Sequence, residues 1–279
     1  MTGVLLALGA SLTWGFADFG AGVGARRLPV PVVLAVSQAA GLALVAVVVA
    51  ASGRPVPSAA QLAWGAGAGV MGVLGLAAFY RALAVGTMGI VGPITATAAA
   101  VPVAYGLARG ERPSALQGVG VALAFLGVVG ASLEPAAEAG ARKVGAGVGL
   151  SLVAAAGFGC TLVALSRASA GGAAWATLSM RAVGAPLVVA AALVLRPRGM
   201  RPSRSWLLLV AVGLGDTGAT ILYGLATTHG LLSVVSVLAS LYPVVLIVLA
   251  RTFLAERLAH LQLAGVAAAL AGVALISAG

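Results

Sequence analysis

The sequence predicts an all-α integral membrane protein: ten transmembrane helices, arranged as two inverted five-helix repeats around a central cavity. Three observations predict this fold class, namely a scarcity of charge, a series of apolar segments of similar length, and an internal repeat. Of the 279 residues, 61% are hydrophobic and 8% are charged, and the mean hydropathy is +1.13. Since soluble domains carry about 25% charged residues, this chain lacks the charge to cover its surface in water and is suited to lipid.

Ten apolar segments follow one another, each long enough for a helix to cross a hydrocarbon core of about 30 Å. They cover residues 2–23, 31–51, 62–84, 89–108, 115–133, 145–166, 173–195, 206–228, 231–250 and 261–278. Helices are favoured over strands, because they satisfy every backbone group within the segment and because transmembrane barrels need alternating segments of about ten residues. We interpret the first segment as a retained span, since no basic residue precedes it and Asp18 interrupts it.

The net charge of +10 does not indicate a nucleic-acid partner. The sixteen basic residues are scattered, mostly at the ends of apolar segments, where membrane proteins keep them. The single cysteine, Cys160, excludes an intrachain disulfide and has no companions for a zinc site. The glycine-rich phosphate loop of ATP-driven proteins and the common hydrolase motifs are also absent from the sequence. We therefore expect no metal, no cofactor and no nucleic acid.

The internal repeat is carried by rare residue types. At an offset of 145, "ERPSALQGVGV" (111–121) aligns with "ERLAHLQLAGV" (256–266), which pairs Glu with Glu and Gln with Gln in a chain that has only four of each. At an offset of 143, Tyr80 aligns with Tyr223 and Gln38 with Arg181. Five spans per repeat is an odd number, so the second copy is inverted in the membrane. Inverted repeats are typical of transporters with a midplane site between the halves and alternating access around it.

The residues of both halves resemble the EamA domain of the drug/metabolite transporter superfamily. "SLYPVVLIVLARTFLAERLAHLQLAGVAAALAGVALIS" (240–277) is similar to the end of that domain, "FYRALAVG" and "GPITATAAAVPV" to its third and fourth helices, and "SLTWGFADFGAGVGARR" (11–27) to its first. The resemblance covers two units, 1–134 and 144–279, joined by a linker at 135–143. It implies ten helices, a central cavity, and transport of small organic metabolites, often outward, without specifying the substrate.

The two Glu-Arg pairs, Glu111–Arg112 and Glu256–Arg257, are expected to mark short turns between the last two helices of each half. We interpret them as solvated turn pairs that cap helix ends, with substrate contact as the alternative. Pro102 and Pro243 lie inside apolar segments, and each removes a backbone hydrogen bond, so we expect each to bend its helix.

Arg181 is the first of three ionisable residues well inside predicted spans, away from their ends, where burying a charge costs at least about 2.5 kcal/mol. Its repeat mate is Gln38, so both halves place a long polar group at the same depth. Arg181 could hold a substrate carboxylate or phosphate through two hydrogen bonds. The alternative is an internal pair with Asp216 that holds the bundle together.

Asp216 precedes Thr220 and Tyr223 by four and seven residues, which places the three on one helix face. Asp216 could be a proton-coupling carboxylate, or it could form a fixed ion pair with Arg181. Asp18 shares a face with Trp14 but lies closer to the membrane edge, so we favour a snorkelling or capping role over a role in coupling.

Weaker candidates are small polar and aromatic residues. Ser236 belongs to a series of serines at three- and four-residue spacing in the ninth segment, and Thr95 is its repeat mate. Such spacing is most typical of close helix packing, with cavity lining as the alternative. Tyr80, Tyr223 and Trp14 could contact substrate rings, although aromatic residues more often anchor helices at the membrane interface.

Together these features predict a secondary transporter, and no enzyme, for a small polar or amphiphilic metabolite, amino-acid-like or drug-like. It is expected to be a multi-pass protein of a bacterial cytoplasmic membrane, and an exporter. The partners are then a small-molecule substrate and membrane lipids, and proton coupling is the one energy source that the residues suggest. The alternatives are a lipid-linked carrier flippase, which needs a lateral opening and a basic cavity, and an integral-membrane enzyme, which needs convergent acids, histidines or a metal motif.

The orientation of the termini is predicted differently by two arguments. Of the sixteen basic residues, Arg181 lies within a span, eleven lie in the loops on the side opposite the termini, and four lie on the side of the termini. The positive-inside rule therefore favours external termini. The family resemblance implies cytoplasmic termini. The substrate, the coupling ion and the oligomeric state are not specified by any of these features.

Overall fold

The computed structural model describes residues 1–85, 91, 94–131, 144–195, 205–254 and 260–279, and every element in it is a helix. The first half contains α1 (Thr2–Ala25), α2 (Val30–Ser52), α3 (Ala59–Val85), the 3₁₀ helix η1 (Thr97–Ala99), α5 (Ala100–Ala108) and α6 (Ala115–Ala131). The second half contains α7 (Val144–Ser169), α8 (Ala173–Leu195), α9 (Ser205–His229), α10 (Leu232–Ala239), α11 (Tyr242–Leu254) and α12 (His260–Ala278). The predicted linker at 135–143 and the pair Glu256–Arg257 lie outside the described residues.

Seven of the described helices are long and apolar enough to cross a membrane, namely α1, α2, α3, α7, α8, α9 and α12. The all-helical, membrane-spanning class is therefore confirmed. The ninth predicted segment, 231–250, is two helices, because α10 ends at Ala239 and α11 begins at Tyr242. The interruption falls just before Pro243, whose missing N–H and ring disfavour a continuous helix. In the first half, the 3₁₀ helix η1 runs directly into α5, which contains Pro102, so this segment departs from a regular α-helix without a break.

The helices of each half pack mainly against the other half. The α1 helix packs against α9, α3 against α7, and α6 against α12, while α1 and α2 make few contacts with each other. The first two pairs are equivalent under the repeat. Small residues permit these approaches: a Cβ added to Gly127 would lie 2.3 Å from the backbone N of Ala269, and one added to Gly157 would lie 2.8 Å from the Cα of Gly75. The two halves therefore share one interior.

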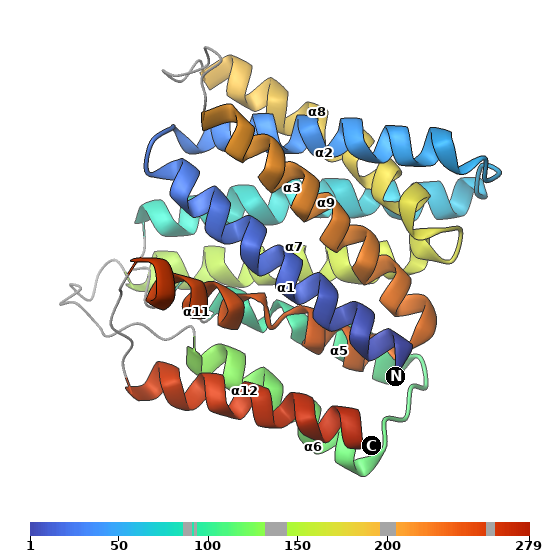
Figure 1. The fold of residues 1–279 in the computed structure, drawn as a ribbon, viewed down its shortest axis with the longest axis vertical. Helices are drawn as coiled ribbons and strands as arrows, with labels where there is room; N and C mark the ends of the chain where they lie inside the picture. The colour runs from blue at the N-terminus through green and yellow to red at the C-terminus, as the bar shows by residue number, and fades with distance from the viewer. Residues whose placement is uncertain (86–90, 92–93, 132–143, 196–204, 255–259) are drawn as a thin grey trace.

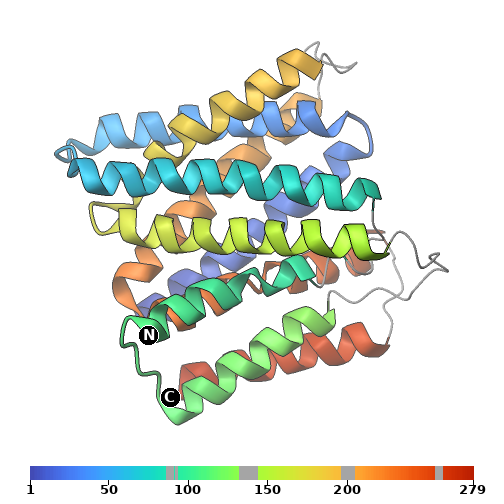
Figure 2. The same ribbon diagram turned by 180° about the vertical axis from the view of Figure 1, so that it is seen from behind.

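Partner helices run in opposite directions, as the views from both sides show (Figures 1 and 2). Gly3 at the start of α1 lies against His229 at the end of α9, and Gly24 near the end of α1 lies against Leu209 near the start of α9. Gly279 lies against Ser114, so both termini lie at one end of the bundle. We call this the termini end, and we call the opposite end, where α1 and α3 finish, the Ala25 end.

Candidate functional site

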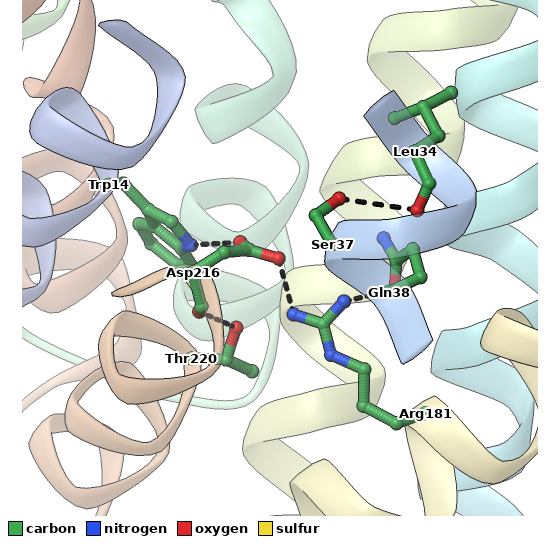
Figure 3. A network of polar contacts seen from close by, with 7 residues as sticks. All are labelled: Trp14, Leu34, Ser37, Gln38, Arg181, Asp216 and Thr220. Atoms are coloured by element: carbon green, nitrogen blue, oxygen red, sulfur yellow. Dashed lines mark hydrogen bonds and ion pairs between the residues drawn. The ribbon is translucent and has the colours of Figure 1, made fainter. Parts of the chain in front are cut away.

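Arg181 on α8 lies at the centre of the bundle and is 3% exposed. Its Nη1 donates a hydrogen bond to Oε1 of Gln38 on α2, and its Nη2 forms an ion pair with Oδ2 of Asp216 on α9 (Figure 3). Three helices from both halves thus meet at one guanidinium. Arginine suits this role because its planar fork reaches two acceptors at once.

Asp216 is held at both carboxylate oxygens. Its Oδ1 accepts a hydrogen bond of 2.9 Å from Nε1 of Trp14 on α1, while Oδ2 binds Arg181. The Thr220 hydroxyl donates to the backbone carbonyl of Asp216 at 2.7 Å, so it stabilises the helix and leaves the carboxylate free of that bond. The Asp216 side chain is nevertheless 31% exposed. The carboxylate is therefore fixed in place and still reachable from the cavity.

One nitrogen of the Arg181 guanidinium has no hydrogen-bond partner among the described residues. This nitrogen, Nε, is buried. A buried donor without an acceptor is costly in an apolar interior, so such a group in a native site is suited to an acceptor that arrives with a ligand. The guanidinium therefore has bonding capacity for an anionic or carbonyl group beyond the pair with Asp216.

A cavity of about 210 Å³ adjoins these residues. It is lined by Trp14, Gln38, Ala68, Gly69, Gly72, Val73, Leu76, Phe158, Thr161, Leu162, Leu165, Met180, Arg181, Gly184, Val188, Asp216 and Thr220. The charged and amide groups are few and the remaining lining is almost wholly apolar, which is the usual composition of a small-molecule site. Its volume lies below the roughly 300–1,000 Å³ of pockets for drug-sized ligands, so it suits a smaller molecule.

Asp18 lies one helical turn beyond Trp14 toward the Ala25 end, and it is exposed. It is also surrounded by protein, close enough to Asp216 and Tyr80 to interact with them electrostatically. At about 100° per residue, Asp18 points roughly 200° away from Phe16, which lies on the outer, lipid-facing side of α1. The exposed part of Asp18 therefore lies on the side of α1 away from Phe16, one helical turn closer to the Ala25 end than Trp14.

Tyr223 and Ser236 lie behind the cavity wall. Both are fully buried, and the Tyr223 hydroxyl shares a 2.9 Å hydrogen bond with Oγ of Ser236 and donates to the Leu162 carbonyl at 3.2 Å. The Tyr223 ring lies 5.9 Å from that of Trp14, which also contacts the Tyr242 ring at 6.4 Å. Tyr223 therefore fixes the position of Trp14 from behind.

The remaining sequence candidates do not line the cavity. Tyr80 is half-buried on α3 and packs edge-on against Phe79 at 5.8 Å. The Thr95 hydroxyl donates to the Val91 carbonyl one turn earlier, which is a local helical bond. The structure thus brings Arg181, Asp216, Gln38, Trp14 and Thr220 together at the cavity.

Two features of this region were missed by sequence reasoning. The first is the apolar lining of α3, although Gly69, Gly72 and Leu76 follow one another at three- and four-residue spacing, which places them on one face. The second is the helix that Glu111 caps, because sequence analysis expected Glu111 to cap a helix end within a solvated turn and did not identify α10. Glu111 is half-buried, and its carboxylate accepts hydrogen bonds from the backbone of α10. The repeat alignment singled out Glu111, but no sequence signal joins it to a helix 121 residues away.

Comparisons with known proteins agree with this architecture. A solved crystal structure superposes with a TM-score of 0.83 at 19% sequence identity, covering 98% of this chain and 95% of that chain, which shows a shared fold. Among proteins of curated function, none matches the chain by sequence. The EamA-like transporter family matches twice, over residues 1–133 and 145–278. The chain therefore belongs to the EamA-like transporter family.

Proposed function

We propose that this protein is a secondary transporter that moves a small polar or amphiphilic metabolite across the cytoplasmic membrane by alternating access. In this proposal its ten predicted segments, of which the ninth is divided into α10 and α11, form two inverted five-helix repeats around the central cavity. The observation that carries the proposal is the Arg181–Asp216 pair, which lies beside the cavity where the two halves meet. An ion pair buried among transmembrane helices is costly to maintain and typically marks a substrate or ion pathway.

The chemistry of the cavity favours an amino-acid-like ligand with one anionic and one cationic group. The unused Nε donor of Arg181 suits a carboxylate, and the accessible carboxylate of Asp216 suits an ammonium group. Apolar residues such as Phe158, Leu162 and Met180 offer contacts to the rest of the ligand. The small volume argues against a bulky drug or a lipid-linked carrier.

Proton coupling is the energy source that these residues support. A carboxylate that accepts hydrogen bonds from an arginine and a tryptophan, and that can also bind a ligand, can bind a proton when these partners leave. Among the described residues Asp216 is the carboxylate in this position, and Asp18, one helical turn beyond Trp14 toward the Ala25 end, lies close enough to interact with it electrostatically. We propose that a proton and the substrate compete for Asp216, which exchanges one for the other across the membrane.

Export is favoured by the charge distribution of the topology that the sequence predicts. In that topology eleven basic residues lie on the side opposite the termini and four on the side of the termini, so the positive-inside rule favours a cytoplasmic Ala25 end. Asp18 is exposed nearer to that end than to the termini end. We propose that the ligand enters from this side and is released outside, as in an exporter.

Counterflow in proteoliposomes tests the proposal. Vesicles loaded with a mixture of unlabelled L-amino acids are diluted into each radiolabelled amino acid in turn, and accumulation of label is measured. We expect accumulation for at least one compound, and we expect Arg181→Ala and Asp216→Asn each to reduce it to the level of empty vesicles. The matched control is Arg167→Ala, which removes an exposed arginine at the end of α7 and leaves the cavity unchanged.

Two results would count against the proposal. Full counterflow by both cavity variants would remove the ion pair from the mechanism. The absence of counterflow for every amino acid, with a correctly folded protein, would exclude the proposed ligand class.

A further inference from the structure

Glu111 joins the turn after α5 to the first turn of α10 on the other half of the molecule. Its Oε1 accepts a hydrogen bond of 2.7 Å from the backbone N–H of Leu232, and its Oε2 accepts one of 2.9 Å from that of Ser233. We call these two bonds the Glu111 cap. A carboxylate at a helix N-terminus satisfies N–H groups that have no partner within the helix, and it complements the positive end of the helix dipole.

The local sequence places this carboxylate. The α5 helix ends in a Schellman motif, in which the N–H of Gly110 binds the Leu107 carbonyl at 3.0 Å and the N–H of Glu111 binds the Gly106 carbonyl at 3.0 Å. Gly110 has a φ of +91°, which glycine adopts without strain. A Cβ added to Gly106 would lie 2.4 Å from Oε2 of Glu111, so only glycine leaves room for the carboxylate there.

The α10 helix depends on this cap more than an ordinary helix would. All of its residues from Leu232 to Ala239 are buried, and its own N-cap residue, Leu231, supplies no side-chain hydrogen bond. The N–H groups of its first turn are therefore away from water and need acceptors from elsewhere. At its other end, α10 is joined to α11 by the turn at Ser240 and Leu241, so it is a short helix distinct from α11.

A continuous set of contacts runs from the Glu111 cap to the central ion pair. The α10 helix carries Ser236, which is hydrogen-bonded to Tyr223, whose ring packs against Trp14. The Trp14 indole donates to Asp216, the partner of Arg181. A displacement of α10 therefore changes the support of the indole that orients the Asp216 carboxylate.

The cap also lies at the end of the bundle farther from Asp18. The turn after α9 lies against Gly3, and the start of α6 lies against Gly279, so the cap is at the termini end. In the described conformation, α10 is held in place on that side while Asp18 is exposed on the other.

We propose that Glu111 is a positioning residue of the transport site. It holds α10 against the first half, fixes Trp14 and Asp216 through Tyr223, and must release α10 when the termini end opens. This role in the cycle rests on the proposed transport function. The cap and its effect on Trp14 are tested below without any substrate.

Cysteine labelling tests whether Glu111 holds α10. In a Cys160→Ala background reconstituted in nanodiscs, Ser233→Cys places a thiol at a position that is 1% exposed. Glu111→Ala is expected to raise the rate of its reaction with a water-soluble maleimide by about tenfold or more, since loss of a hydrogen bond to a charged group shifts a local opening equilibrium by that order. Arg112→Ala, which removes the exposed neighbouring charge, is expected to leave the rate unchanged.

Two further variants separate release of the cap from general unfolding. Ser151→Cys, buried on α7 near the Ala25 end, should stay unlabelled in the Glu111→Ala protein. Gly106→Ala should raise Ser233→Cys labelling as Glu111→Ala does, because the added methyl displaces the carboxylate without removing its charge. If Glu111→Ala fails to fold, Gly106→Ala and Glu111→Gln are used in its place. Unchanged labelling of Ser233→Cys in both variants would show that Glu111 does not hold α10.

Tryptophan emission tests the positioning role. With Trp64, Trp175 and Trp206 replaced by phenylalanine, the emission maximum reports on Trp14 alone. Glu111→Ala should shift this maximum, whereas Arg112→Ala should not. Faster labelling with unchanged Trp14 emission would show a purely structural cap and overturn the positioning role. If Glu111→Ala both speeds labelling and shifts the Trp14 emission, while the wild-type protein transports no amino acid, the proposed function is refuted and this inference stands.

Discussion

Replacing Asp216 by alanine should destabilise the protein more than replacing Arg181 by methionine. The reason is the difference in exposure, because Arg181 is 3% exposed and the Asp216 side chain is 31% exposed. Without Asp216, the guanidinium stays buried with only the Gln38 oxygen, and leaving a buried charge unpaired costs about 3–5 kcal/mol. Without Arg181, the carboxylate keeps its bond from Trp14 and contact with water, so the cost is nearer the about 1.5–3 kcal/mol of a charge-assisted hydrogen bond.

Thermal unfolding in detergent, followed by far-ultraviolet circular dichroism, measures both costs. A change of 1 kcal/mol shifts the Tm of a chain of this size by about 2–4 °C, so Asp216→Ala should lower the Tm by about 6–20 °C and Arg181→Met by about 3–12 °C. The double variant should be more stable than Asp216→Ala alone, since it leaves no unpaired buried charge. Arg167→Ala, at an exposed position, should shift the Tm by less than about 2 °C.

The competing expectation is that this pair is worth no more than an average interhelical hydrogen bond in a membrane, about 0.6 kcal/mol. That value corresponds to a Tm change of about 2 °C. A shift this small for Asp216→Ala, or a larger loss for Arg181→Met than for Asp216→Ala, would refute the reasoning from burial.

Two glycine positions give further predictions. Gly72 lines the cavity, and a Cβ added there meets its nearest neighbour only at 3.5 Å, so Gly72→Ala should fold normally. The larger side chain of Gly72→Leu should fill the cavity and abolish counterflow. The control is Gly67→Leu on the same helix. At Gly265, an added Cβ would lie 2.2 Å from backbone atoms of α6, so Gly265→Ala should destabilise the protein by about 1–3 kcal/mol in thermal unfolding, as overpacking does. Gly118→Ala, with open space around its position, should leave the Tm unchanged, and an equal loss there would contradict the packing argument.

Segment length and composition predicted the helical membrane class, because a segment in lipid must satisfy its backbone hydrogen bonds internally and therefore forms a helix. The repeat alignment also placed Gln38 and Arg181 at the same depth, and in the structure they are hydrogen-bonded. A pair with Asp216 was one of two interpretations of Arg181, and the structure contains that pair. Its role in binding or coupling stays a prediction.

The sequence did not predict contacts in which a side chain binds the backbone of a distant segment. Glu111 was expected to cap a helix end in a solvated turn, and it is instead half-buried and caps α10. The identity of the capped helix could not be predicted, because its backbone N–H groups do not depend on residue type. The ninth segment reads as one apolar run, yet the helix is interrupted at Ser240 and Leu241. Periodicity cannot show such an interruption, since apolar residues continue through it and Pro243 alone marks its position.

The packing of α1 against α9 has a consequence for how the protein is made. Ala25 ends the first helix and Ser205 begins its partner, so 180 further residues must be synthesised before the two can meet. At about 5–20 residues per second, the first helix waits roughly 10–40 s in the bilayer with Trp14 unpartnered. Pairing of α1 with α9 therefore comes late in synthesis, and insertion factors and membrane proteases have access to the first half before that.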